Sequence, residues 1–523
     1  MNKLYIFIIV GILFSSCDEL VTYDNPKAVT DEDWWNSEQD ARSALNTIYS
    51  FVPKGITGDG GRLNYNYSAD EAYQVNKTDY TSIANGNLIA ENKKAEDIWK
   101  GSYTYIRRAN RFFKYVDNCA VEASLLERFK LEARTLRAWI YLELVMWYGD
   151  VPLTTEELSP DLESSLAKTD KTEVLNFVIT ELEAASNGLP KEYSSNDRWR
   201  MTSGAALSFK ALAHLLLDQW EEAASAAKLV CESGVYELYN NLDDPANSYR
   251  LLFTQDGINN KETIIYKSKG CSSAYSNNTP ASLGGVSGFA PLGNLVDIYE
   301  TLQGKTLAEM SIDSVDYYKR NPGFNRDPRL DATVILPGTS FNGQTISPFD
   351  DSATNDNRIG AKDSSPSGYW MKKYVDIREK KVGGVIDYMI LRLPDVMLMY
   401  AEAMIEQGEF HDALAISYID EIRARAGMPP VDLTKYNSKE SMRQLLRRER
   451  RVELALEGRR IYDLRRWEEG ALLQVPAYGA TNPATGETVQ IATRNFIIPD
   501  HYLLPIPQSE MLVNDNMIQN DGY

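Results

Sequence analysis

Two stretches of the chain, residues 201–228 and 392–419, share one pattern of small and aromatic residues at helical spacing. Each is typical of a helix, a tight turn and a second helix that an aromatic residue opens. Small side chains let two helices approach closely, and the aromatic ring fills the space between them. The coincident positions are Ala211 and Ala401, Ala213 and Ala403, Trp220 and Phe410, and Ala223 and Ala413.

This pattern is typical of the tetratricopeptide hairpin, a unit of about 34 residues. The alternative is an ordinary antiparallel helix pair in an α-rich core, but four matching positions favour the repeat. About 190 residues separate the two copies, so they do not form one uninterrupted array. Apolar residues at helical spacing predict further helices over residues 37–52, 94–116 and 124–148.

The stretch between the two copies is different in kind. Residues 321–370 contain 27 Gly, Pro, Asn, Asp or Ser among 50, a density that excludes a long helix. Short strand-like pieces stand at residues 263–266 and 333–336. We therefore expect a mainly α fold, in which a tetratricopeptide-like scaffold carries a loop-rich lobe with short strands. The expected single unit spans 31–523, with the scaffold at 31–235 and 386–523 and the lobe at 236–385.

Charge and missing motifs exclude several functions. The 55 Lys and Arg stand against 74 Asp and Glu, a formal net charge of −19, which disfavours nucleic acid and anionic lipid as partners. The three histidines stand apart, and the chain contains no CxxC, GxSxG or phosphate-binding loop. No catalytic residue is predicted, although so many carboxylates leave an acid pair of the glycosidase kind open.

Two charged segments each allow a structural and a functional interpretation. A single helix is expected over residues 445–467, where arginines alternate with acids, and this favours an ion-pair network within the molecule over a nucleic-acid surface. Aspartates 350, 351, 356 and 363 cluster without EF-hand spacing. A solvated loop is the favoured interpretation of that cluster, and a calcium site is the alternative, so no cofactor is predicted.

The N-terminus carries a targeting signal. Lys3 precedes an apolar run from Leu4 to Phe14, which is too short to span a bilayer, and Ser15-Ser16-Cys17 follows. This pattern is similar to a bacterial lipoprotein processing site. We expect a signal peptide over 1–16, an acylated Cys17 and a tether over 17–30, so that the lipid anchor is the only membrane contact. The alternative is a plain secretory signal beside an incidental cysteine.

The other cysteines are Cys119, Cys231 and Cys271. Buried free thiols are the favoured interpretation, and one disulfide among them stays open because the expected compartment is oxidising.

Aromatic residues in the polar loops are the candidate ligand-binding residues. Thirty-one of the 55 aromatics are tyrosines. A ring with a polar tip can stack on the apolar face of a sugar, while a packed or merely exposed ring is the alternative for each one. Replacement of Trp370 by alanine is expected to weaken ligand binding without unfolding the protein. The four candidates are Tyr80, Tyr275, Tyr369 and Trp370.

Distinctive sequence blocks follow one another along the chain: WWNSEQDARSALNTIY (34–49), EARTLRAWIYLELVMWYGDVPL (132–153), the 201–240 hairpin ending in SGVYEL, PLGNLVDIYE (291–300), RLPDVMLMYAEA (392–403), RRERRVELALEGRRIYDLRRW (447–467) and LLPIPQSEM with IQNDGY (503–523). With the lipoprotein start, their order resembles the SusD/RagB family of Bacteroidetes outer-membrane lipoproteins. The resemblance covers most of the chain. Asp18 and Glu19 after the cysteine are similar to that phylum's surface-export signal.

The resemblance implies a function. Such proteins are lipid-anchored in the outer membrane at the cell surface, above a SusC-like TonB-dependent transporter, to which they deliver captured oligosaccharide. It implies binding without catalysis, with ligand residues in the loop-rich lobe and the N-terminal loops; some members hold calcium. The alternatives are the same role with peptide cargo, a secreted glycan hydrolase, and a repeat-type adaptor with no small ligand.

Overall fold

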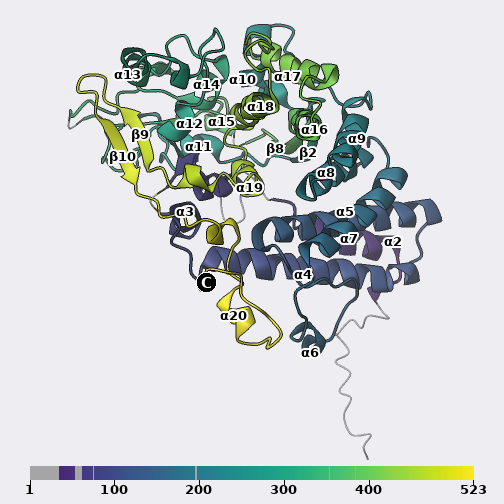
Figure 1. Cartoon of the computed structure of the whole chain (residues 1–523). Coiled ribbons are helices and arrows are strands. Elements are labelled where there is room, and N and C mark those ends of the chain that lie inside the picture. Colours follow the sequence, from purple (N-terminus) through teal and green to yellow (C-terminus); the bar gives the residue numbers. More distant parts are fainter. Residues whose placement is uncertain (1–33, 54–61, 75, 195–196, 353, 383) are drawn as a thin grey trace, which may run out of the picture.

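The computed structural model describes residues 34–53, 62–74, 76–194, 197–352, 354–382 and 384–523 (Figure 1). The predicted signal peptide over 1–16, the lipidation site Cys17 and the predicted tether over 17–30 lie outside the described residues.

Long antiparallel helices form the first part of the scaffold, and the helices expected from the sequence are confirmed. Ser37 caps the first of them, because its hydroxyl accepts a hydrogen bond from the Asp40 backbone N–H while the Asp40 carboxylate accepts one from the Ser37 N–H. Each helix packs against the next along one layer (Figure 1). The expected helices are α2 (Glu38–Tyr49), α4 (Lys93–Tyr115) and α5 (Ala123–Tyr148), and α7 (Lys171–Gly188) is a further one that was not predicted.

The predicted repeat is confirmed as two helical hairpins. The first consists of α8 (Ser203–Leu216) and α9 (Trp220–Cys231), and the second of α16 (Leu393–Gln407) and α17 (Ala413–Arg425). The α9 helix packs against α16, so the two hairpins are neighbours in space although the lobe separates them in sequence (Figure 1). The superimposed alanines at the crossings are buried, except that Ala413 is exposed where its counterpart is buried.

The loop-rich lobe contains only short elements, as its composition predicts. Its strands make two-stranded antiparallel sheets. Strand β2 pairs with β8, and β8 leads directly into α16, so both ends of the lobe are tied to the scaffold. The elements of this region are α10 (Ser248–Leu252), β2 (Thr263–Lys267), α11 (Ala274–Asn278), β3 (Ala290–Pro291), α12 (Gly293–Val296), α13 (Ile312–Arg320), α14 (Pro328–Thr333), β4 (Val334–Ile335), β5 (Ser340–Phe341), β6 (Gln344–Thr345), β7 (Trp370–Met371), α15 (Glu379–Val382) and β8 (Tyr388–Arg392).

The helix expected over 445–467 is wrong as a single element. The chain forms α18 (Lys439–Glu453) and α19 (Arg460–Arg466), and the turn between them holds Leu456 at φ 59° and Gly458 at φ 74°. These left-handed conformations interrupt a helix. Further elements are η1 (Arg62–Ser68), β1 (Ala72–Tyr73), α3 (Thr78–Asn85), α6 (Pro160–Glu163), β9 (Ala477–Thr481), β10 (Thr488–Ala492) and α20 (Gln508–Met511), beside short 3-10 turns.

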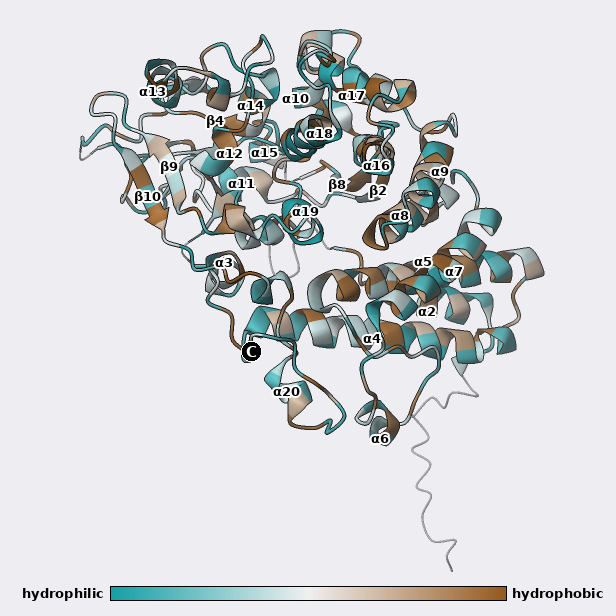
Figure 2. Cartoon of the chain, in the orientation of Figure 1, coloured by the Kyte–Doolittle hydropathy of each residue, from teal (hydrophilic) through white to brown (hydrophobic). Residues whose placement is uncertain are grey.

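The predicted ion-pair network is confirmed, and its partners reach across the molecule. Although α18 is hydrophilic in Figure 2, eight of its 15 residues are buried. Glu453 is fully buried and its carboxylate pairs with Arg392 and Arg425, both of which also bind Glu262. A buried charge that lacks a partner destabilises the fold through its desolvation penalty. The paired network therefore fixes α18 against the lobe and the second hairpin.

The structure also describes the three cysteines, the clustered aspartates and the apolar character of the helices. Cys119, Cys231 and Cys271 are free thiols, the first and last of them buried. The four clustered aspartates are exposed, and within the described residues no group of three or more His, Cys, Asp or Glu side chains could hold a metal ion. No helix in the described part of the chain is long and apolar enough to cross a membrane.

Candidate functional site

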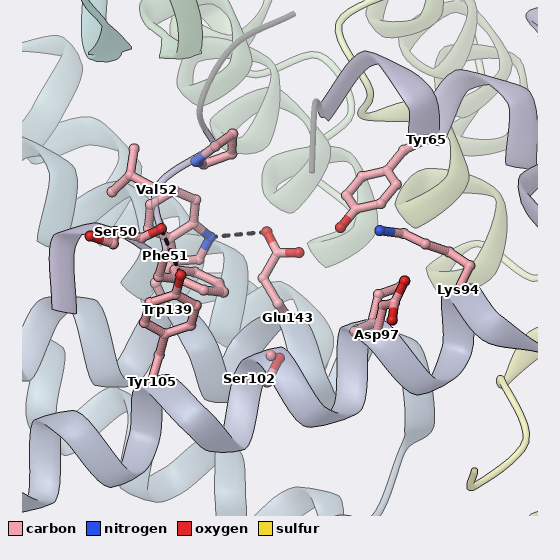
Figure 3. A pocket seen from close by; sticks show the side chains of 13 residues that line it. Ser50, Phe51, Val52, Tyr65, Lys94, Asp97, Ser102, Tyr105, Trp139 and Glu143 are labelled. Atoms are coloured by element: carbon pink, nitrogen blue, oxygen red, sulfur yellow. Dashed lines mark hydrogen bonds between the residues drawn. The ribbon is translucent and has the colours of Figure 1, made fainter. Parts of the chain in front are cut away.

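A cavity of about 250 Å³ opens between the end of α2, the η1 turn and the facing sides of α4 and α5 (Figure 3). We call it the aromatic pocket, because four of its lining side chains are aromatic. The residues that line it are Ser50, Phe51, Val52, Pro53, Tyr65, Lys94, Asp97, Ile98, Gly101, Ser102, Tyr105, Trp139 and Glu143.

One face of α4 forms the floor of the pocket. Its lining residues recur every three or four positions from Lys94 through Gly101 to Tyr105, which is the spacing of one helical face. Asn92 starts the helix by accepting a hydrogen bond from the Ala95 backbone N–H. A Cβ atom placed on Gly101 would meet nothing within 4 Å, so this glycine leaves the middle of the floor open.

Aromatic rings form one wall. The α2 helix ends at Tyr49, and the following turn directs Phe51 against Tyr105 and Trp139, with ring centroids 5.7 and 5.2 Å apart. The phenol of Tyr105 donates a hydrogen bond to the Ser50 carbonyl at 3.0 Å. Trp139 stacks on Phe209 of α8 at 4.9 Å, so the first hairpin supports this wall from behind.

Glu143 is buried at the centre of the site. Its Oε1 accepts a hydrogen bond from the Trp139 indole at 3.0 Å, and its Oε2 accepts one from the Tyr462 hydroxyl at 2.5 Å. Tyr462 belongs to α19, and its ring packs against Tyr65 with centroids 6.0 Å apart. The C-terminal part of the chain therefore positions both the carboxylate and the opposite aromatic wall.

Lys94 supplies the positive charge of the site. Its Nζ lies 5.6 Å from the Tyr65 ring centroid and 4.9 Å from that of Tyr80. Burial lowers the pKa of Lys94, but the neighbouring Tyr65 and Tyr80 raise it by more, so this pKa lies above its ordinary value and the ammonium stays charged. Asp97 is exposed and pairs with Lys93 at 2.9 Å.

This arrangement is suited to holding a polar ligand that has an apolar face. Figure 3 shows Glu143 between Trp139 on one side and Lys94 and Tyr65 on the other. Aromatic faces, an ammonium donor and hydroxyl groups converge on one small cavity, which is the composition of a binding site. Both oxygens of Glu143 are held by the indole and the phenol, so this carboxylate orients the walls.

Of the four candidate residues from the sequence, Tyr80 lies beside the pocket. It stands on α3 and is 7% exposed, with its ring 6.3 Å from that of Tyr65. It contacts Lys94 and does not itself line the cavity. A part for Tyr80 in ligand binding stays a prediction.

The other three candidates lie in the lobe and are buried. Tyr275 and Trp370 belong to a small hydrophobic cluster of the lobe, while Tyr369 belongs to the main core. Trp370 is fully buried and its indole donates a hydrogen bond to Ser287 at 2.7 Å. This burial argues against the expectation that Trp370→Ala leaves folding intact, which stays a prediction. Whether these three rings serve a ligand stays a prediction, but none of them offers an open face in this structure.

The sequence interpretation missed most of the pocket. Trp139 and Glu143 stand four residues apart on one helix, a spacing that equally fits two core positions. Phe51 follows a helix end and gives no signal of its own. The recurrence of Lys94, Gly101 and Tyr105 on one face of a predicted helix was the one available indication.

Comparisons with known proteins agree with the architecture. A model described as "SusD family" matches residues 252–523, and one described as "Starch-binding associating with outer membrane" matches residues 27–215. A SusD-like protein of Formosa agariphila, P25, is 26% identical and covers 99% of this chain and 98% of its own length. A SusD-like protein of Bacteroides ovatus is 24% identical, over 89% of this chain and 82% of its own.

Solved structures share the fold. A SusD-like carbohydrate-binding protein of Bacteroides fragilis superimposes with a TM-score of 0.80 at 29% identity, covering 92% of this chain and 99% of that one. A laminarin-binding SusD-like protein gives 0.70 at 22% identity, over 94% of this chain and 100% of that one. Since the SusD family model alone spans more than half of the sequence, the chain belongs to the SusD family.

Proposed function

We propose that this protein is a cell-surface lipoprotein that binds oligosaccharide in the aromatic pocket and passes it to a SusC-like TonB-dependent transporter. The observation that carries the proposal is the pocket itself, which joins four aromatic side chains, the Lys94 ammonium and open floor space at Gly101. A sugar ring presents an apolar face to such side chains and hydroxyls to the polar ones.

The comparisons support the class of ligand. The B. fragilis neighbour is described as carbohydrate-binding, another solved neighbour as laminarin-binding, and the family model over residues 27–215 as starch-binding in association with the outer membrane. We infer a neutral glycan, because the lining carries one ammonium and two carboxylates and so offers no excess positive charge. The role is binding without turnover, and cargo that is handed on is bound weakly, at about μM to mM.

A steric block of the pocket floor tests the binding site. Gly101→Leu places a side chain into the open space, while Gly101→Ala adds a single methyl group and is the matched control. By calorimetry with laminarin and starch oligosaccharides, we expect Gly101→Leu to weaken binding at least 10-fold and Gly101→Ala to keep most of the affinity. Equal affinity in all three proteins would show that the ligand binds elsewhere.

Hydrolysis of the glycan is tested with the same purified protein and the same oligosaccharides. Incubation of the purified protein with each bound glycan should release no new reducing ends, because the proposal includes no catalytic step. The appearance of reducing ends that Glu143→Gln abolishes would replace the binding proposal with a hydrolase.

The lipid anchor and the partner are tested in the native host. We propose that Cys17 is acylated, so Cys17→Ala should abolish palmitate labelling and move the protein out of the outer-membrane fraction. The wild-type protein, solubilised gently, should co-purify with a TonB-dependent β-barrel. Unchanged fractionation of Cys17→Ala would contradict the anchor, and recovery without any such barrel would contradict the partner.

A further inference from the structure

Three aromatic side chains form an exposed cluster at the end of α13, far from the pocket. Tyr317 is 47% exposed and Phe324 is 55% exposed, and Tyr318 is half-buried beneath them. The centroids of Tyr317 and Phe324 lie 5.5 Å apart with perpendicular planes, and those of Tyr318 and Phe324 lie 6.4 Å apart. We call Tyr317, Tyr318 and Phe324 the aromatic platform.

The platform is held in place by local structure. The Asn321 backbone N–H bonds to the Tyr317 carbonyl and ends α13, and the Phe324 N–H then bonds to the Asn321 carbonyl, which turns the Phe324 ring back onto the helix. Arg320 fixes the helix by donating a hydrogen bond to the Pro483 carbonyl at 3.1 Å, at the tip of the β9–β10 hairpin. The exposed rings therefore sit on an anchored element.

Amide groups surround the rings. The Asn321 amide donates to the Tyr317 carbonyl at 3.0 Å, and the Asn325 amide donates to the Gln303 side chain at 2.9 Å. Each of these side chains has donors or acceptors to spare beyond the bond it makes. Arg320 binds Asp316 at 2.7 Å. The guanidinium of Arg326 lies 5.7 Å from the Tyr318 ring centroid, but it is buried and donates hydrogen bonds to backbone carbonyls. The exposed ring faces therefore stand beside amides, which is the chemistry that recognises a sugar.

The platform and the aromatic pocket lie on opposite sides of the molecule. In Figure 1, α13 stands at the upper left, whereas α4 and α5 run across the lower half. A short oligosaccharide cannot reach both sites, but a long polysaccharide that passes over the surface can. Engagement at two sites raises the overall affinity without any new contact in either one.

We infer that the aromatic platform is a second glycan-binding surface, which holds a distal part of a polysaccharide whose other part occupies the pocket. This inference rests on the proposed function. The platform acts on polymers and has little effect on the affinity for a hexasaccharide.

The test compares a polymer with a hexasaccharide of the same sugar. The variant is Tyr317→Ala/Phe324→Ala, and the matched control is Ile312→Ala, which removes a 79% exposed aliphatic side chain from the same helix. The probes are laminarin and amylopectin in affinity gels, with laminarihexaose and maltohexaose in calorimetry. We expect the double variant to bind the retained polymer about 10-fold more weakly, with unchanged hexasaccharide affinity and an unchanged melting temperature.

The outcomes separate this inference from the proposed function. Unchanged polymer affinity in the double variant overturns the platform, whatever the pocket does. Unchanged hexasaccharide affinity in Gly101→Leu overturns the pocket and leaves the platform result standing. If the wild-type protein is retarded by neither polymer and binds neither hexasaccharide, both proposals are overturned. Loss of a co-purifying protein from the double variant, with polymer binding intact, identifies the platform as a protein contact and overturns the inference.

Discussion

At Gly101, a substitution changes both the helix propensity of α4 and the open volume of the pocket. It lies inside α4, where glycine is less favourable than alanine by about 1 kcal/mol, and its missing side chain leaves open volume. Gly101→Ala should therefore raise the free energy of unfolding by about 0.5–1 kcal/mol, as measured by urea denaturation. A decrease would show that the pocket floor cannot accept a methyl group.

Trp370 tests burial in the lobe. Its ring is fully buried and its indole N–H is bonded to Ser287. Trp370→Ala should lower the free energy of unfolding by about 3–5 kcal/mol, since it leaves a large cavity. Tyr317→Ala, at an exposed ring, should change it by no more than about 0.5 kcal/mol and serves as the control. Similar values for the two variants would contradict the placement of Trp370 in the core.

At this scale the sequence identifies ring types but not their exposure. Trp139 and Trp370 look alike in the sequence and both are buried, yet Trp139 also borders the aromatic pocket whereas Trp370 packs in a small cluster of the lobe. The difference depends on partners distant in the chain, Phe209 for the first and Ser287 for the second. The exposure of Tyr317 and Phe324 is not predictable from the sequence, because it depends on the turn that folds one ring onto the other.

At the scale of elements, periodicity predicted most of the helices of twelve or more residues, missed α7 and failed at one junction. The alternating charges over 445–467 suit a continuous helix, but the backbone N–H groups of Leu456 and Gly458 bond to Glu71 and Asn66 instead. Those acceptors lie far away in sequence, so helical periodicity could not reveal them. The hairpins, by contrast, depend on local spacing and were predictable.

The junction between η1 and α18–α19 makes stability depend on pH. Asp70 is buried and pairs with Arg451 and Arg460, both at 3.0 Å. Burial raises the pKa of Asp70, but the two guanidinium groups lower it by more, to about 2. A depressed pKa stabilises the fold above the ordinary value near 4, and this contribution is lost as pH falls from about 4 to about 2.

Asp70→Asn should therefore lower the free energy of unfolding at pH 7 by about 3–5 kcal/mol, because two buried guanidinium groups lose their carboxylate partner. It should also lose less stability than the wild type between pH 4 and pH 2. Urea denaturation across that range measures both effects. Glu38→Gln, which removes an exposed ion pair with Arg42, is the control and should follow the wild type. A wild-type acid slope in Asp70→Asn would contradict the assignment.

For the whole molecule, the lobe and the scaffold share one buried network. Arg329 from the lobe pairs with Glu453 of α18 at 3.2 Å, and Lys373 from the lobe pairs with Glu457 at 2.9 Å. Separation of the two parts would leave these charges buried and unpaired. We therefore expect a single cooperative thermal transition, with coincident circular dichroism and tryptophan fluorescence curves. Two resolved transitions would show that the lobe unfolds by itself.

The hydrogen bond from the Gly458 N–H to Asn66 can form only late in the synthesis of the chain. A ribosome makes the chain from its N-terminus, and 392 positions separate these two partners. At about 5–20 residues per second, roughly 20–80 s pass between the emergence of one and of the other. Until then Tyr65 has no Tyr462 to pack against, so a polypeptide truncated before Tyr462 lacks the support of one wall of the aromatic pocket.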